Sequence, residues 1–191
     1  MKDINSNTHL VVISGLRCVG KTTLIQNLSL HPKFRKIDKY TTRRPRKNES
    51  SQQIFVDEIP PQCDCVYELY KNSPLYGFRS SQIAEIIQSG QIAVSDIIPV
   101  HLIKEIKNLY PNNLSIIVER NLSASKYRAI SSARGYTNEE IENQLIQRKT
   151  LNNEYKANRN IFDHVIFNDG HPLEMFLETL NIINQSQPLT Y

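Results

Sequence analysis

The feature that most restricts the fold is a glycine-containing segment that directly follows an apolar run. Residues 9–14 (HLVVIS) are largely apolar and rich in β-branched side chains, which is typical of a strand buried on both faces. Residues 15–22 (GLRCVGKT) satisfy the pattern G-x-x-x-x-G-K-[ST] without a mismatch. Apolar residues between 24 and 28 then recur at helical spacing until Pro32. A strand, a glycine loop and a helix in this order predict a phosphate-binding loop, or P-loop.

The residue types of this loop predict separate roles in holding a nucleoside triphosphate. Glycines allow backbone N–H groups to surround the phosphates, and the helix N-terminus adds positive potential. We expect Lys21 to reach the outer phosphates and Thr22 to ligate Mg²⁺. We also expect the Lys21 side chain to face solvent when no nucleotide is bound. The predicted nucleotide-binding residues of the loop are Gly15, Cys18, Val19, Gly20, Lys21, Thr22 and Thr23.

Beyond the loop, apolar strand segments alternate with helical patterns. Further strands of the main sheet are predicted at 91–97, 114–118 and 164–167. Helices are predicted before Gly90, after Pro99, from a Thr137–Glu140 capping box to about Asn158, and after Pro172. This alternation predicts an α/β fold with a mainly parallel sheet, helices on both faces, and ligands at the carboxyl ends of the strands.

Two further segments carry specific expectations. Residues 40–64 are polar and interrupted by prolines, so we expect loops around a short strand near 54–56, forming a substrate-binding flap. One face of the last helix is expected to consist of Leu173, Phe176, Leu177, Leu180 and Ile183.

Composition narrows the class of protein. Of the 191 residues, 39% are hydrophobic and 22% charged, which is ordinary for one soluble core. No stretch approaches the roughly 18 apolar residues of a membrane span, and residues 1–8 are polar, so we expect a cytoplasmic protein with no membrane partner. Cys18, Cys63 and Cys65 lack the spacing of a disulfide framework or zinc site and are expected to be reduced thiols.

The formal net charge of +4 is small for this length and comes partly from one basic cluster at 43–47. Local concentration of charge indicates a phosphate site rather than a nucleic-acid-binding face, so no nucleic-acid partner is expected. In this cluster Arg43 and Arg46 lie on either side of Pro45. Two guanidinium groups at this spacing can fork around one phosphate dianion.

Residues 40–49 (YTTRRPRKNE, with Asn48 and Glu49 at its end) resemble the acceptor-phosphate motif of guanylate kinases, T-T-R-x-P-R-x-G-E. The resemblance covers nearly the whole chain. The other matching segments, in family order, are Glu68, Tyr76-Gly77, Ser95-Asp96-Ile97, Arg134-Gly135 and Asp163 to Asp169 (DHVIFND).

The resemblance implies a three-layer P-loop kinase fold in a single domain, 1–191. It implies a small NMP-binding insertion at about 37–80 and a lid at about 132–150. The donor would be ATP with Mg²⁺, and the acceptor a nucleoside monophosphate.

The same resemblance implies roles for individual residues. Arg43, Arg46 and Tyr76 would hold the acceptor phosphate, and Glu68 would accept hydrogen bonds from a guanine edge. Arg134 would close over the transferring phosphoryl group, and Asn168 would lie near the adenine of ATP. Together with Arg148, a candidate substitute for a second lid arginine, the predicted catalytic set is Lys21, Asp96 and Arg134.

The prediction of a functional role for Asp96 also follows from its place after an apolar run, independently of the resemblance. This residue follows the buried run 92–94, and a carboxylate at the carboxyl end of such a strand can contact Mg²⁺ or its water. We therefore predict Thr22 and Asp96 as the metal-contacting residues, with Asp96 also facing the acceptor.

Four positions on the acceptor side depart from the family pattern. Gln53 stands where a phosphate-binding tyrosine is expected, and Lys39 where a serine is expected. Phe78 stands in place of a hydroxyl residue, and Ile98 in place of a second aspartate. These departures leave the acceptor open.

The lid departs at one position. A second arginine is expected near Gln144 or Leu145, and the nearest one is Arg148, one helical turn farther along. Arg148 is a candidate to substitute for it. Loss of one lid arginine would remove part of the charge stabilisation of phosphoryl transfer and give weak turnover with GMP.

Three functions remain open. The leading one is a kinase that transfers the γ-phosphoryl group of ATP to GMP or a related nucleotide. The second is a kinase for a phosphorylated sugar of the ribose bisphosphate type, which the departures at Lys39, Phe78 and Ile98 favour. The third is a guanylate-kinase-like binding module, which the intact P-loop disfavours. The oligomeric state is open, with a homodimer as one alternative.

Overall fold

The computed structural model describes residues 8–47, 49, 53–70, 72–168 and 170–186. Asn48, Asp169 and residues 1–7, which entered the sequence predictions, lie outside the described residues. The chain forms two compact units. The core unit consists of residues 1–36, 85–121 and 158–191, and the second unit of residues 37–84 and 122–157.

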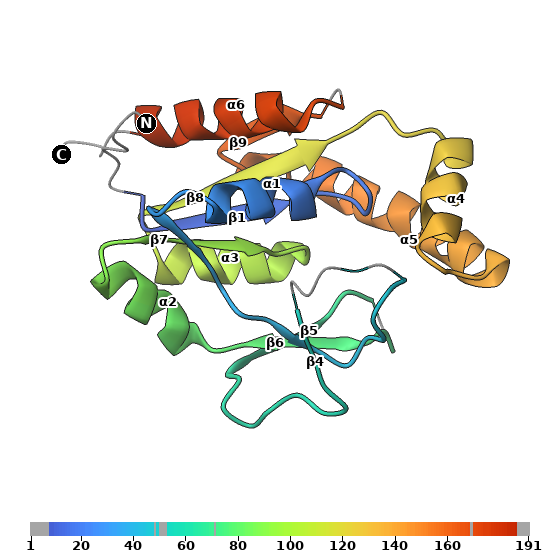
Figure 1. Ribbon diagram of the computed structural model, residues 1–191, viewed down its shortest axis with the longest axis horizontal. Coiled ribbons are helices and arrows are strands. Elements are labelled where there is room, and N and C mark those ends of the chain that lie inside the picture. Colours follow the sequence, from blue (N-terminus) through green and yellow to red (C-terminus); the bar gives the residue numbers. More distant parts are fainter. Residues whose placement is uncertain (1–7, 48, 50–52, 71, 169, 187–191) are drawn as a thin grey trace. The chain divides into compact units, whose positions relative to one another are not determined.

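The core unit contains a five-stranded parallel sheet (Figure 1). Its strands, in spatial order, are β2 (Phe34–Lys36), β7 (Ile92–Asp96), β1 (Leu10–Ser14), β8 (Asn113–Glu119) and β9 (His164–Phe167). All five residues of β1 are buried, because this strand has neighbours on both edges and helices on both faces. The predicted α/β fold with a parallel sheet is confirmed.

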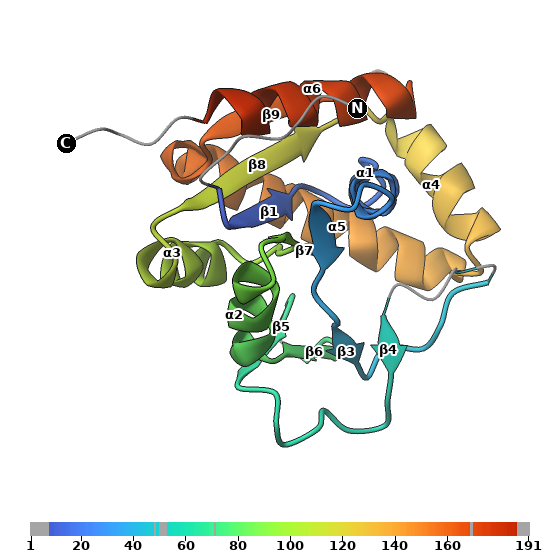
Figure 2. The ribbon, with the colours of Figure 1, turned by 60° about the vertical axis from the view of Figure 1, so that its left-hand side comes forward.

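Helices cover both faces of this sheet, as Figures 1 and 2 show. Successive side chains of β1 point to opposite faces of the sheet. Val11 and Ile13 belong to the core cluster shared with helices α1 (Lys21–Ser29) and α6 (Pro172–Gln185). Helix α3 (Val100–Leu109) lies on the opposite face and buries Leu102, Ile103 and Ile106.

The predicted inner face of α6 is partly wrong. Leu173 and Leu177 are 53% and 49% exposed, whereas the helix buries Met175, Thr179 and Ile183. The hydrophobic leucines suggested a face that begins at Leu173, but Thr179 takes a core position because its hydroxyl donates to the Met175 carbonyl within the helix (2.8 Å).

The second unit contains a four-stranded sheet. Its strands, in spatial order, are β4 (Ile54–Phe55), β3 (Tyr40–Thr41), β6 (Leu75–Phe78) and β5 (Cys65–Glu68). β3 pairs parallel to β4 and antiparallel to β6, and β6 pairs antiparallel to β5. The prediction of loops around one strand in residues 40–64 found β4 and missed β3, and no strand was predicted at β5 or β6. Each has only two to four residues, too few to show a hydrophobic period.

Two helices complete the second unit. α4 (Ala124–Ala133) was not predicted, whereas α5 (Asn138–Ala157) begins at the predicted capping box. The Thr137 N–H donates to the Glu140 carboxylate (2.7 Å), and the Glu140 N–H donates to the Thr137 hydroxyl (3.2 Å). Helix α2 (Ser80–Gln88) connects the two units, and a short 3₁₀ helix, η1, covers Arg159–Ile161.

The three cysteines are free thiols, as expected. Among the described helices, none is long and apolar enough to cross a membrane.

Candidate phosphate and acceptor sites

The glycine loop begins where β1 ends, and its first glycine is fixed by close packing. Gly15 has φ +137°, and a Cβ atom there would lie 2.3 Å from the Val118 carbonyl oxygen of the neighbouring strand. Gly20 has φ +106° and immediately precedes α1. Only glycine fits the first of these positions without moving backbone, so the sequence pattern and the packing demand the same residue.

The first turn of α1 suits an anion. The Gly20 N-cap supplies no side-chain hydrogen bond, and the turn carries no acidic residue. Its N–H groups and positive dipole end are therefore available to negative charge. Thr22 is exposed in this turn, and Thr23 is partly buried.

The Lys21 side chain does not face solvent, so that expectation is wrong. The residue is 8% exposed, and its ammonium group donates to the carbonyl oxygens of Gly15 (2.6 Å) and Leu16 (2.8 Å). An ammonium group has only donors, and two carbonyls of the loop accept hydrogen bonds from it where the stem is buried. The charge of Lys21 is thus held inside the glycine loop.

Two more predicted residues of the core unit lie beside this loop. Asp96 ends β7 and is in register with Ile13 of β1, one residue before the strand's end. Asn168 is 9% exposed, and its amide donates to the Val19 carbonyl (2.6 Å) while its oxygen accepts from the Gly170 N–H (2.9 Å). Asn168 therefore fixes the backbone of the loop; its predicted place near an adenine stays a prediction.

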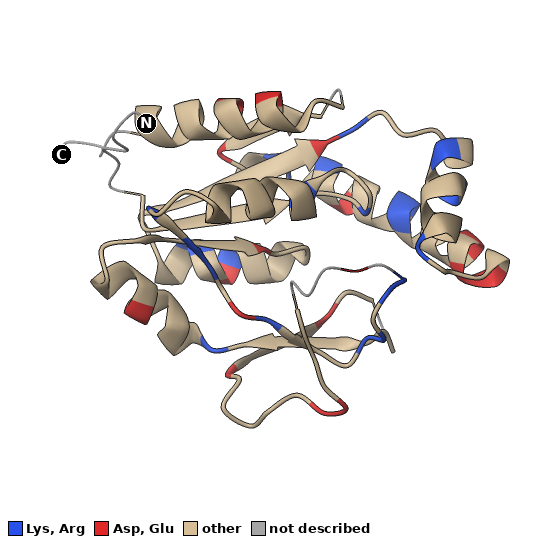
Figure 3. Ribbon diagram, in the orientation of Figure 1, with Lys and Arg blue, Asp and Glu red and all other residues tan. Residues whose placement is uncertain are grey.

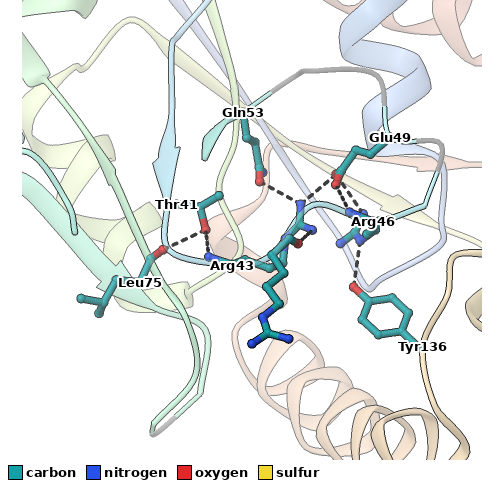
Figure 4. A network of polar contacts seen from close by, with 8 residues as sticks. Thr41, Arg43, Arg46, Glu49, Gln53, Leu75 and Tyr136 are labelled. Atoms are coloured by element: carbon teal, nitrogen blue, oxygen red, sulfur yellow. Dashed lines mark hydrogen bonds and ion pairs between the residues drawn. The ribbon is translucent and has the colours of Figure 1, made fainter. Parts of the chain in front are cut away.

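The loop after β3, here called the arginine loop (residues 42–47 and 49), brings its two arginines to one carboxylate (Figure 4). Arg43 Nη2 donates to Glu49 Oε1 (2.7 Å), and the Arg46 backbone N–H donates to Glu49 Oε2 (2.9 Å). The Arg46 guanidinium also pairs with Glu49 at 3.6 Å. Arg43 and Arg46 thus converge on the Glu49 carboxylate, and their convergence on a phosphate stays a prediction.

Arg43 is the more deeply embedded of the pair. Its side chain is 10% exposed, against 25% for Arg46. It donates to the Arg44 carbonyl (2.7 Å) and to the Gln53 side chain (3.1 Å), and it packs over the Phe55 ring with Cζ 5.2 Å from the centroid. Gln53, which stands in place of the expected tyrosine, thus supports Arg43.

Electrostatics in this loop favour the charged forms of Glu49 and Arg46. Burial opposes ionisation of Glu49, but hydrogen bonds from Arg43 and Arg46 and the charges of both outweigh it, so the pKa of Glu49 lies below its usual value. Burial likewise lowers the pKa of Arg46, but Tyr136, Glu49 and Tyr76 outweigh it and raise that pKa above its ordinary value.

A turn between α4 and α5 contacts the same loop. The Arg46 Nε donates to the Tyr136 hydroxyl (2.8 Å), and the Lys47 N–H donates to the Arg134 carbonyl (3.3 Å). Sequence reasoning selected Arg134 and Gly135 here and missed Tyr136. No local pattern marks that residue, because its partner lies 90 positions away in the chain.

The remaining predicted acceptor residues lie on the four-stranded sheet. Tyr76 is 7% exposed, is in register with Thr41, and stacks on Tyr67 with ring centroids 5.6 Å apart. Glu68 is exposed at the end of β5. Two departures from the family pattern are buried in this unit, Lys39 at 2% and Phe78 at 0% exposed.

Arg148 lies on the face of α5 that includes Gln144. The buried Tyr127 of α4 donates its hydroxyl to Gln144 (2.9 Å), and Arg148 packs over the Tyr127 ring with Cζ 5.5 Å from the centroid. Figure 3 shows further basic residues on these helices and on the arginine loop of the second unit. Within the described residues, no three His, Cys, Asp or Glu side chains gather as a metal-binding group.

Comparison with solved structures decides the fold. The chain is similar to guanylate kinase from Anaplasma phagocytophilum, with TM-score 0.65 and 18% identity over 95% of this chain and 87% of that one. The chain has a guanylate-kinase-like fold. It is also similar to the SH3-kinase fragment of tight junction protein 3 in its apo form, with TM-score 0.54 and 13% identity over 93% of this chain and 57% of that one.

The guanylate-kinase-like fold is therefore detected through structure. No family model matches the chain, and no curated protein matches it in sequence.

Proposed function

We propose that the protein is an ATP-dependent kinase for a nucleoside monophosphate, most directly GMP or a related guanine nucleotide. The observation that carries the proposal is that one chain contains both an intact P-loop and two arginines that converge on one carboxylate. The guanylate-kinase-like fold supports it, because guanylate kinase from Anaplasma phagocytophilum has this fold.

The loop residues fit a triphosphate. Gly15 leaves no room for a side chain against Val118, the first turn of α1 offers N–H groups, and Lys21 carries a charge held inside the loop. Bound Mg²⁺ would neutralise charge on the phosphate oxygens, with Thr22 and Asp96 as the residues proposed to hold the ion or its water.

In the proposed reaction, an oxygen of the acceptor phosphate forms a new bond to the γ-phosphorus of ATP. The bond from that phosphorus to the β–γ bridging oxygen breaks, giving ADP and a nucleoside diphosphate. Arg43 and Arg46 would orient the acceptor phosphate, with Tyr76 beside them. Lys21, Arg134 and Arg148 would stabilise charge on the transferring group, so no general base is required.

A phosphorylated sugar is the second candidate acceptor. Buried Lys39 and Phe78 occupy positions where the resemblance expects hydroxyl groups, which weakens the case for a guanine site. Arg43, Arg46 and the P-loop would serve this reaction equally, since both acceptors present a phosphate monoester.

The test is coupled ATP consumption measured against a panel of nucleoside monophosphates and sugar phosphates. We expect turnover with GMP above all other acceptors, and turnover with a sugar bisphosphate alone would favour the second candidate. Lys21→Ala should abolish turnover, whereas Lys156→Ala, which removes an exposed lysine of α5, should not. Absence of turnover with every acceptor would favour a binding module instead.

A further inference from the structure

Tyr136, in the turn between α4 and α5, contacts Arg46 of the arginine loop, and the proposed function gives Tyr136 no role. Its hydroxyl lies 2.8 Å from Arg46 Nε, on the side of Arg46 away from Glu49 (Figure 4). Hydrogen bonds fix the backbone around it: Gly135, just after the C-cap of α4, has φ +86°, and the Tyr136 N–H donates to the Ser131 carbonyl (3.3 Å). The capping box of α5 begins at the next residue.

The direction of this hydrogen bond leaves the hydroxyl proton of Tyr136 free to be donated to another group. Arginine nitrogens only donate, so the Tyr136 hydroxyl oxygen is the acceptor and its own proton remains to be donated elsewhere. Among the residues that the structure describes, no oxygen receives that proton.

The neighbouring groups also have donors and positive charge in excess. Arg43 Nε has no hydrogen-bond partner among the described residues. This is unusual for a polar atom in a side chain that is only 10% exposed. The network contains two guanidinium groups and one carboxylate, a net charge of +1. A bound anion would accept hydrogen bonds from these unsatisfied donors and would balance the surplus positive charge.

We propose that Tyr136 is a ligand of the acceptor phosphate, donating its hydroxyl proton to a phosphate oxygen held by Arg43 and Arg46. It takes the part of the tyrosine that the family pattern places at Gln53. The ligand is a phosphate monoester, and the inference rests on the proposed function for the location of the acceptor. Since Tyr136 lies in the turn between α4 and α5, the same bond ties phosphate binding to the order of that turn.

The test is calorimetric titration of GMP, guanosine and inorganic phosphate, at constant ionic strength, into the parent and Tyr136→Phe. The variant removes one hydroxyl and keeps the ring. We expect about tenfold weaker binding of GMP and of inorganic phosphate, the loss typical of one hydrogen bond to a charged group. Guanosine, which lacks the phosphate, should be unaffected. The matched control is Tyr127→Phe, which removes a hydroxyl bonded to Gln144 between α4 and α5 and should bind both anions as the parent does.

A second comparison separates direct binding from mere positioning of Arg46. In an Arg46→Lys background the Nε donor is gone, so a Tyr136 that only orients Arg46 would have no further effect. If Tyr136 binds the phosphate directly, adding Tyr136→Phe to Arg46→Lys would still weaken phosphate binding. Loss of the effect in that background overturns the proposal, as does equal binding of GMP and phosphate by the parent and Tyr136→Phe.

Turnover distinguishes this inference from the proposed function. If the parent binds phosphate through Tyr136 but consumes no ATP with any acceptor, the inference stands and the kinase assignment fails. If turnover with GMP is present and Tyr136→Phe binds both anions normally, the kinase assignment stands and the inference fails. A parent that binds neither GMP nor inorganic phosphate contradicts both.

Discussion

Arg43 combines a structural and a proposed binding role in one side chain. Its guanidinium contacts Glu49, Gln53 and the Phe55 ring while only 10% of the side chain is exposed. Arg46 makes fewer such contacts and is more exposed. The two arginines, which the sequence treats as an equivalent pair, should therefore respond differently to substitution.

We predict that Arg43→Ala weakens both acceptor binding and folding, whereas Arg46→Ala mainly weakens acceptor binding. Removing a charge-assisted hydrogen bond should cost on the order of 1.5 to 3 kcal/mol, or about ten- to a hundredfold in GMP affinity. Arg43→Lys keeps the charge but loses the bidentate fork, so it should remain impaired. The measurements are calorimetric binding of GMP and of a non-hydrolysable ATP analogue, with urea unfolding of each variant. Loss of ATP binding with intact GMP binding would reverse the assignment of donor and acceptor residues.

At the scale of elements, one carboxylate joins three parts of the core unit. Asp163, directly before β9, accepts from Lys107 of α3 at 2.7 and 2.8 Å and from the Ser115 N–H of β8 at 2.8 Å. Burial opposes its ionisation, but the hydrogen bonds from Lys107 and Ser115 outweigh it, so the pKa of Asp163 lies below its usual value.

This lowered pKa predicts a pH dependence of stability. The folded protein binds the Asp163 proton less tightly than the unfolded chain, so the carboxylate stabilises the fold above the unfolded pKa of about 3.9. That contribution is lost as the pH falls through the lower folded pKa. We predict that Asp163→Asn lowers the free energy of unfolding by about 1 kcal/mol at pH 7, a value reduced for partial exposure, and by less near pH 3.

Urea unfolding of the parent, Asp163→Asn and the control Asp57→Asn at both pH values tests this prediction. Asp57 is exposed, and its substitution should change little at either pH. A loss for Asp163→Asn that is the same at pH 7 and pH 3 would show that packing, rather than charge, is responsible.

What the sequence could predict differs between the two units for a physical reason. Strands β1, β7 and β8 of the core unit are largely buried and read as apolar runs, so they were predicted, as was β9, which is only partly buried. The edge strand β2 was not predicted, because only one of its three residues is apolar and buried. β3, β5 and β6 form because they pair with one another, and their two to four residues show no hydrophobic period.

Nine of the ten residues that resemble the acceptor motif are described, and the contacts of Arg43 and Arg46 with Glu49 are local. The Tyr136 contact with Arg46 is not, and only the fold reveals it.

At the scale of the whole molecule, the P-loop belongs to the core unit and the arginine loop to the second unit. A ligand that binds one unit should suppress local opening of that unit first, because binding stabilises the states that contain the intact site. The donor and acceptor should therefore leave separate signatures in amide hydrogen exchange.

We predict that a non-hydrolysable ATP analogue with Mg²⁺ gives its largest protection in peptides covering residues 15–29, and that GMP gives its largest protection in peptides covering residues 40–47 and 131–137. At a hundred times the dissociation constant, binding adds about 2.7 kcal/mol to the stability of the bound state, enough to slow exchange through its opening about a hundredfold. Lys21→Ala should remove the first pattern and leave the second, and Arg46→Ala should do the reverse. Exchange measured by mass spectrometry on the three proteins, each with no ligand, with GMP and with the analogue, makes the comparison. If GMP instead protects residues 15–29 most strongly and the analogue protects residues 40–47, the assignment of the donor to the core unit and the acceptor to the second unit is wrong.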